Sequence, residues 1–192
     1  MVDGVPDTET AILDAALAEV LAHGIRRTTA SDIARRSGVS RQTLYRYWPD
    51  AQTLFAALVT RELIAVLPAP GEDPATLDEF VARLVETADR VRALPLVERL
   101  RDTDPELFAR YILDRLGTSQ RVIHAELVRG VGAGQRGGYV RAGAPAELAA
   151  MLLLIVQSAV QSAPLVAEWL PVVAWRAELR RALAGYLAVQ PS

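Results

Sequence analysis

Residues 28–54 read TTASDIARRSGVSRQTLYRYWPDAQTL, and this stretch carries the signals of two short helices joined by a glycine turn. Thr29 can cap a first helix that reaches Arg36, because a threonine oxygen accepts a free backbone N–H at a helix start. Asp32 stands at the third helical position, as in a capping box. Gly38 supplies the permissive backbone of a tight turn. The stretch therefore predicts a helix-turn-helix.

The second helix of this motif, predicted over 41–47 with Ser40 as its cap, is polar almost throughout. Only Leu44 is a clear core residue. The other residues offer two guanidinium groups, an amide, a hydroxyl and two phenols. Such side chains suit the reading of DNA base edges and phosphates.

The chain around the motif completes a small N-terminal head. Apolar residues at helical spacing predict a helix over 7–23, which Gly24 ends. Trp48 is predicted to close the core of the head, and Asp50 to cap a helix that bridges to the rest of the chain. We therefore expect a DNA-binding domain over 1–50 and a connecting helix over 51–67.

Composition and charge support the same interpretation. The 192 residues are 51% hydrophobic, with few aromatics and no cysteine, which indicates a packed all-α protein without disulfides. The net charge is only −2, but the stretch from Arg26 to Tyr47 holds six arginines and one acid. This asymmetry is typical of a basic DNA-binding head on an acidic body.

A second domain is predicted over 68–192, because prolines and glycine between Pro68 and Pro74 give the strongest linker signal. Gly130–Gly143 is predicted as a flexible loop. With the head, the chain should hold about nine helices. The helices expected in this domain cover 74–94, 95–101, 105–131, 145–162 and 171–189.

The two last predicted helices, 145–162 and 171–189, carry more apolar surface than one core needs. They predict a homodimer built as an intermolecular four-helix bundle. The alternative is that both helices are central to the core of a monomer.

The second domain also offers an apolar site for a small-molecule effector, although each candidate residue also fits an ordinary core. No constellation of histidines and carboxylates supports an enzyme, and the sequence predicts no metal site and no cofactor. The candidate lining residues are Phe80, Leu84, Phe108, Tyr111, Ile112, Met151, Ile155 and Trp175.

The N-terminus lacks the features of a signal peptide, and the longest apolar run, Leu148–Val156, is shorter than the roughly 20 residues of a membrane span. A soluble cytoplasmic protein without a membrane partner is expected.

From about Ile12 to Leu58 the sequence closely resembles the DNA-binding domain of the TetR/AcrR family of transcriptional regulators, on the residues TTASDIARRSGVSRQTLYRYW. The resemblance implies a homodimer that binds a palindromic operator in double-stranded DNA and releases it when a small molecule binds the C-terminal domain. It also implies that the last two long helices form the dimer interface.

Carried over by position, the resemblance implies DNA-binding roles for residues of both motif helices. Thr29 would cap its helix and touch the DNA backbone, and the helix from Ser40 to Tyr47 would enter the major groove. The resemblance implies base contacts for Arg41, Gln42 and Thr43, and phosphate contacts for Tyr45 and Tyr47.

Two positions depart from the family pattern. Ala51 stands where the family commonly has a lysine, so one phosphate contact is either missing or moved to Arg46 or Arg61. Gln42 is longer than the usual residue and can reach adenine. Ala51 also leaves open an interaction-only or antirepressor protein that keeps the fold without binding DNA.

Overall fold

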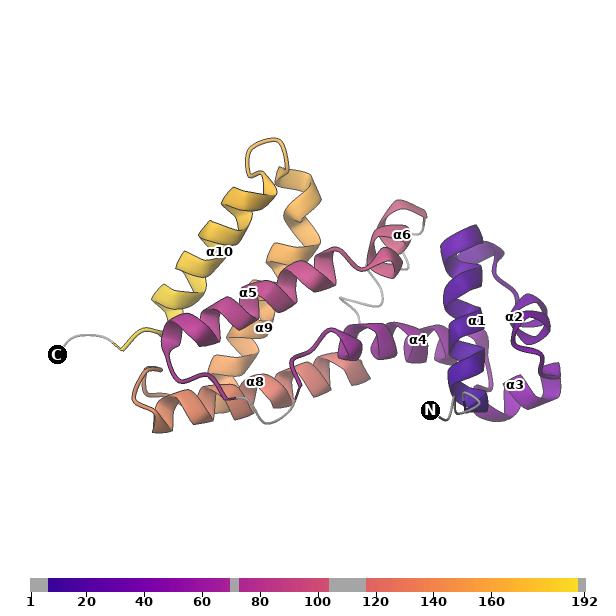
Figure 1. Cartoon of the computed structure of the whole chain (residues 1–192), viewed down its shortest axis with the longest axis horizontal. Coiled ribbons are helices and arrows are strands. Elements are labelled where there is room, and N and C mark those ends of the chain that lie inside the picture. Colours follow the sequence, from indigo (N-terminus) through magenta and orange to yellow (C-terminus); the bar gives the residue numbers. More distant parts are fainter. Residues whose placement is uncertain (1–6, 70–72, 104–116, 190–192) are drawn as a thin grey trace, which may run out of the picture. The chain divides into compact units, whose positions relative to one another are not determined.

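The computed structural model describes residues 7–69, 73–103 and 117–189, whose helices are labelled in Figure 1. Over these residues the chain forms nine α-helices and two short 3-10 helices, and no strand. The predicted all-α class is thus confirmed. The chain divides into two compact units, one made of Met1–Ala65 and Leu94–Ser119, the other of Val66–Ala93 and Gln120–Ser192.

The first unit is built around α1, which contacts α2, α4 and α6. Ile12, Ala16 and Val20 repeat every four residues along α1 and are fully buried in the shared core. Trp48 is buried in the same core, as predicted. The elements of this unit are α1 (Thr8–His23), η1 (Ile25–Arg27), α2 (Ala30–Ser37), α3 (Arg41–Tyr47), α4 (Ala51–Ala65) and α6 (Pro95–Thr103).

Helix α6 differs from the expectation, because the sequence assigned it to the second domain. Its Leu96 and Leu100 lie in the core of the first unit. The Arg99 guanidinium also donates a hydrogen bond to the Ala22 carbonyl near the end of α1, at 3.2 Å. An apolar pair at i and i+4 needs a partner surface, and α1 supplies it.

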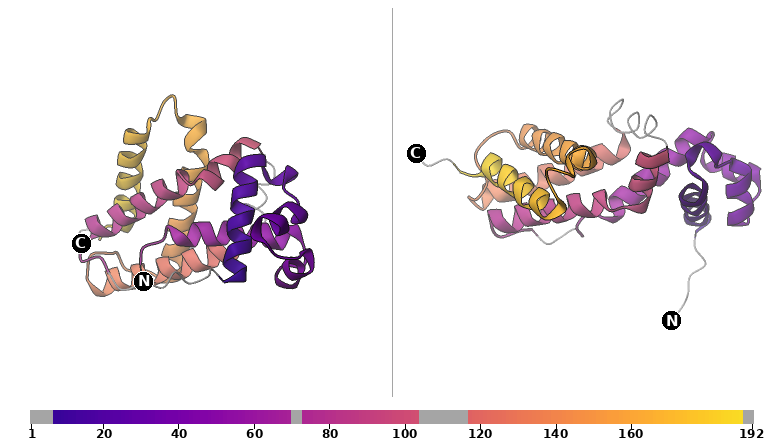
Figure 2. Two further views of the ribbon diagram at one scale, coloured as in Figure 1. Left: turned by 45° about the vertical axis from the view of Figure 1, so that its right-hand side comes forward. Right: turned by 90° about the horizontal axis from the view of Figure 1, so that it is seen from above.

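The second unit contains a hairpin of α9 and α10, and both helices contact α5 (Figures 1 and 2). Asp89 on α5 forms ion pairs with Arg92 of its own helix, at 2.9 Å, and with Arg176 on α10. The indole of Trp175 donates to the Ala159 carbonyl at 3.2 Å. The elements are α5 (Leu77–Arg92), α8 (Thr118–Arg136), α9 (Pro145–Ser162), η2 (Ala163–Val166) and α10 (Val172–Leu187).

Helix α5 begins later than the sequence predicted, at Leu77 instead of Pro74. Thr76 caps it by accepting a hydrogen bond from the Glu79 N–H at 3.2 Å. The Glu79 carboxylate accepts in return from the Ala75 N–H at 2.8 Å. Thr76 and Glu79 together satisfy two backbone donors, which fixes the start at this point.

The bounds of helix α8 differ from the prediction at both ends. The helix expected over 105–131 has its first part outside the described residues, and α8 starts at Thr118, after a non-helical Gly117. It also extends into the predicted glycine loop as far as Arg136, while residues 137–143 are non-helical, as predicted. A Cβ at Gly130 would lie 2.9 Å from the Phe80 ring, so this glycine permits close packing within a helix and does not mark a loop.

Helix α9 spans the predicted residues and has one buried face and one exposed face. Leu148 and Leu152 are buried, whereas Leu154 is 62% exposed. The segment Pro145–Val166 is long and apolar enough, by length and composition, to cross a membrane. The apolar run Leu148–Val156 within it is by itself too short. The core helix of a soluble protein passes the same test, so the segment alone is weak support for a membrane span.

Candidate nucleic-acid interface

The start of α2 is fixed by Thr29, as its sequence predicted. The Thr29 Oγ1 accepts a hydrogen bond from the Asp32 N–H at 3.2 Å and donates one to the Asp32 carboxylate at 2.5 Å. The hydrogen bond from Thr29 lowers the pKa of Asp32, with Arg35 acting in the same direction. Thr29 and Asp32 therefore hold the first turn of α2.

The turn between α2 and α3 depends on Gly38, which adopts the left-handed conformation with φ 72°. The following Val39 N–H donates to the Ala34 carbonyl at 3.1 Å, which closes the end of α2. Ser40 then caps α3 by accepting from the Thr43 N–H at 3.0 Å, and the two hydroxyls lie 2.9 Å apart. The predicted helix-turn-helix is confirmed.

Helix α3 turns one face to the core and presents the rest to solvent. Leu44 is only 1% exposed, and it fastens the helix to the first unit. An open hollow of about 560 Å³ lies along the outer face and is lined by Gln42, Thr43, Tyr45 and Arg46. Four of the eight residues that the sequence assigned to DNA therefore line one accessible surface of α3.

Each arginine of α3 lies over a tyrosine ring of the same helix. The Arg41 guanidinium is 5.9 Å from the centre of the Tyr45 ring, and that of Arg46 is 5.5 Å from the centre of the Tyr47 ring. The Tyr47 ring in turn lies 5.7 Å from that of buried Trp48. The two distances from a guanidinium to a ring centre, 5.9 Å and 5.5 Å, fall in the range of cation–π contacts.

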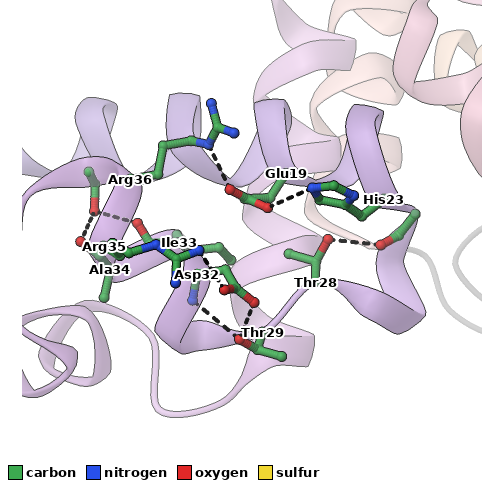
Figure 3. A network of polar contacts seen from close by, with 11 residues as sticks. Glu19, His23, Thr28, Thr29, Asp32, Ile33, Ala34, Arg35 and Arg36 are labelled. Carbon is green, nitrogen blue, oxygen red and sulfur yellow. Dashed lines mark hydrogen bonds and ion pairs between the residues drawn. The ribbon is translucent and has the colours of Figure 1, made fainter.

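Two of the six arginines counted in the sequence are neutralised by carboxylates, as Figure 3 shows. Arg35 pairs with Asp32 at 2.8 Å, and Arg36 pairs with Glu19 on α1 at 2.7 Å. Glu19 is 5% exposed and also faces His23 at 3.6 Å. Asp32 is already part of the count from Arg26 to Tyr47, whereas Glu19 is not, so the pair of Arg36 with Glu19 makes the local excess of positive charge smaller than that count indicates.

Glu19 is the residue that the sequence interpretation missed. It lies on the buried face of α1, three residues after Ala16 and seven after Ile12. A single carboxylate in an apolar helical stripe is the signal that could have revealed it, since a buried charge needs a partner.

The start of α4 shows the surroundings of Ala51, the position at which the family commonly has a lysine. Asp50 accepts from the Thr53 N–H at 2.7 Å and caps the helix, as predicted. Ala51 is exposed at the first helical position. A longer cationic side chain at this position would extend into solvent without displacing the core.

The predicted effector residues are only partly brought together. Phe80 and Trp175 lie in the apolar core of the second unit, with Leu84 and Ile155 packed against it. Met151 is 45% exposed and lies apart from this core. The other three, Phe108, Tyr111 and Ile112, lie outside the described residues.

A capped helix-turn-helix with an outward polar second helix, on an all-helical chain, defines a DNA-binding transcriptional regulator. The sequence model described as "Bacterial regulatory proteins, tetR family" matches residues 12–58. The HTH-type transcriptional regulator Mb2274c of Mycobacterium bovis is 43% identical over 184 residues, which cover 94% of this chain and 95% of that protein. The chain belongs to the TetR family.

Solved structures share the fold across almost the whole chain. A TetR-family transcriptional regulator from Rhodococcus sp. superposes with a TM-score of 0.66 at 18% identity, covering 94% of this chain and 98% of the other. The regulator FadR of Bacillus subtilis, in complex with stearoyl-CoA, gives a TM-score of 0.62 at 14% identity, covering 92% and 98%. At these identities the likeness concerns the fold alone.

Proposed function

We propose that this regulator is a cytoplasmic repressor that binds a palindromic operator as a homodimer and leaves it when a largely apolar small molecule binds the second unit. The observation that carries the proposal is the surface of α3. A helix that buries one leucine and exposes arginine, glutamine and tyrosine side chains has the chemistry of a major-groove reader.

The side chains of α3 divide into base-reading and phosphate-binding groups. Arg41 and Gln42 are exposed at the first two positions of the helix, where recognition helices contact base edges. Arginine pairs with guanine and glutamine with adenine through two hydrogen bonds each. Arg46, Tyr45 and Tyr47 offer a cation and two phenols for phosphates, and these contacts set the register.

The homodimer is supported by the exposed apolar face of the α9–α10 hairpin. Met151 and Leu154 on α9 and Val172 and Val173 on α10 are all at least 42% exposed in the single chain. Trp169, between the two helices, is 79% exposed. A two-fold interface would bury this surface and would match the symmetry of a palindromic site.

Thermodynamic linkage describes how an effector would release the protein from its operator. A ligand that binds the second unit shifts the dimer away from its DNA-binding state only by its difference in affinity for the two states. Effector and operator must therefore weaken each other by the same factor. The apolar cluster around Phe80 and Trp175 favours a ligand with a large hydrocarbon part.

The proposal is tested by selecting binding sites from a random pool of double-stranded DNA with the purified full-length protein at low salt. We expect enrichment of a palindrome whose half-sites are about one helical turn apart. In size-exclusion chromatography, the protein bound to the selected DNA should have twice the mass of one chain. Failure to enrich any sequence would instead favour an interaction-only protein, for which Ala51 is the one motivating residue.

A further inference from the structure

We infer that Tyr45 is a positioning residue for Arg41, so that a phenol ring of α3 sets how sharply the arginine discriminates between bases. The inference rests on the proposed reading of DNA by α3. Its observation is the 5.9 Å between the Arg41 guanidinium and the centre of the Tyr45 ring.

The helix itself creates this pair. Arg41 is the first residue of α3 and Tyr45 follows four positions later, so the two occupy the same side of the helix. Side chains on a helix lean toward its N-terminus, which brings the Tyr45 ring over the preceding turn. Leu44 fixes the rotation of α3 against the core and keeps the pair on the outer surface.

Arg41 gains more from this support than an arginine elsewhere on the helix. The N-terminal end of a helix carries a partial positive charge, which disfavours a cation there. The negative face of the Tyr45 ring offsets part of this cost. A guanidinium already held on a ring also loses less rotamer freedom when it pairs with a base.

The ring of Tyr45 also lies where the other reading groups are. Tyr45 is 41% exposed and lines the hollow of α3 together with Gln42, Thr43 and Arg46. A phosphate contact uses the Tyr45 hydroxyl, whereas support of Arg41 uses the ring face. The two roles are therefore separable by substitution.

The second arginine–tyrosine pair supplies a matched control. Arg46 lies 5.5 Å from the centre of the Tyr47 ring, and Tyr47 leans on buried Trp48. Tyr47 is 37% exposed, close to the value for Tyr45. Because Tyr47 is placed on a phosphate, loss of its ring should weaken binding to both DNAs by the same factor and leave base discrimination by Arg41 unchanged.

The experiment measures dissociation constants of the full-length protein for the selected operator and for a copy altered at the base pair whose preference disappears in Arg41→Ala. The ratio of the two constants is the discrimination. Tyr45→Phe keeps the ring and should keep the ratio. Tyr45→Leu should lower the ratio about two- to five-fold, the range of an exposed cation–π contact. In the Arg41→Ala background, Tyr45→Leu should leave the ratio unchanged. Circular dichroism confirms that each variant is folded.

Three results overturn the inference. An equal loss of affinity on both DNAs in Tyr45→Leu shows a phosphate ligand only. A change of the ratio by Tyr45→Leu in the Arg41→Ala background shows that Tyr45 reads a base itself. If Arg41→Ala loses preference at no base pair of the operator, the role that Tyr45 would support is removed, while operator binding stands. Failure of the wild-type protein to select any DNA refutes the proposed function itself and is seen before any variant is made.

Discussion

The buried ion pair between Glu19 and Arg36 makes an asymmetric prediction about the stability of the first unit. Glu19 has a side chain that is 7% exposed, whereas that of Arg36 is 47% exposed. Replacing Arg36 with methionine keeps most of the apolar stem but leaves the Glu19 carboxylate, among the described residues, with His23 at 3.6 Å as its remaining ion-pair partner. Replacing Glu19 with leucine frees a guanidinium that water can solvate.

The magnitudes follow from this difference in exposure. Removing one partner of a buried ion pair costs about 3 to 5 kcal/mol. Because Arg36 is half exposed, water screens part of the pair, and we expect Arg36→Met to cost about 2 to 3 kcal/mol. Glu19→Leu buries an alkyl group in an apolar stripe and should cost less than about 1 kcal/mol or stabilise. The double variant should resemble Glu19→Leu alone.

Amide hydrogen exchange over α1 and α2 measures these free energies within the first unit, without assuming that the whole chain unfolds as one. Protein concentration must be held fixed, since a dimer couples its stability to association. Equal effects of Arg36→Met and Glu19→Leu would refute the reasoning, and so would a cost below about 0.5 kcal/mol for the arginine change, the usual size for a surface substitution.

Three further predictions concern other parts of the chain. Burial raises the pKa of Asp89, but its two arginine partners outweigh this effect and leave the pKa below the ordinary value of 3.8. The ionised Asp89 therefore stabilises the folded second unit fully above that pH. This stabilisation is lost as the pH falls through the lower pKa of the folded state. Urea titrations should show that Asp89→Asn weakens this acid-side decline. Gly130→Ala should destabilise the second unit by about 1 to 3 kcal/mol because its Cβ meets the Phe80 ring, whereas Gly132→Ala, with only the tip of an arginine 3.5 Å away, should be neutral or stabilising in thermal unfolding. Ala51→Lys should tighten binding to any DNA and steepen the salt dependence by about one unit of slope, and an unchanged slope would show that this helix start does not approach phosphate.

The local chemistry of the helix-turn-helix was predictable because each signal acts within a few residues. Thr29 and Ser40 cap their helices, and Gly38 takes the left-handed turn, through contacts no more than five positions apart. The exposed face of α3 also follows from the sequence, since Leu44 is the only aliphatic residue of that helix. Which of the exposed groups touch bases remains a prediction.

The errors came from packing between distant segments. Helix α6 joins the first unit because Leu96 and Leu100 find a surface on α1, a choice that spacing within α6 cannot express. The glycines from 130 to 143 predict a loop, whereas Gly130 lies in a helix and its lack of a side chain makes room for the ring of Phe80, fifty residues away. A count of charges over the motif includes Arg36 as a cation for DNA, because its partner, Glu19, lies outside the motif.

The central claim is that Arg41 on α3 reads a base of a specific operator. The most direct test compares the affinities of wild-type protein and Arg41→Ala for the selected operator and for random DNA of the same length and salt. We predict a loss of about 1 to 3 kcal/mol on the operator and almost none on random DNA. An equal loss on both would contradict the claim and would make Arg41 a phosphate contact.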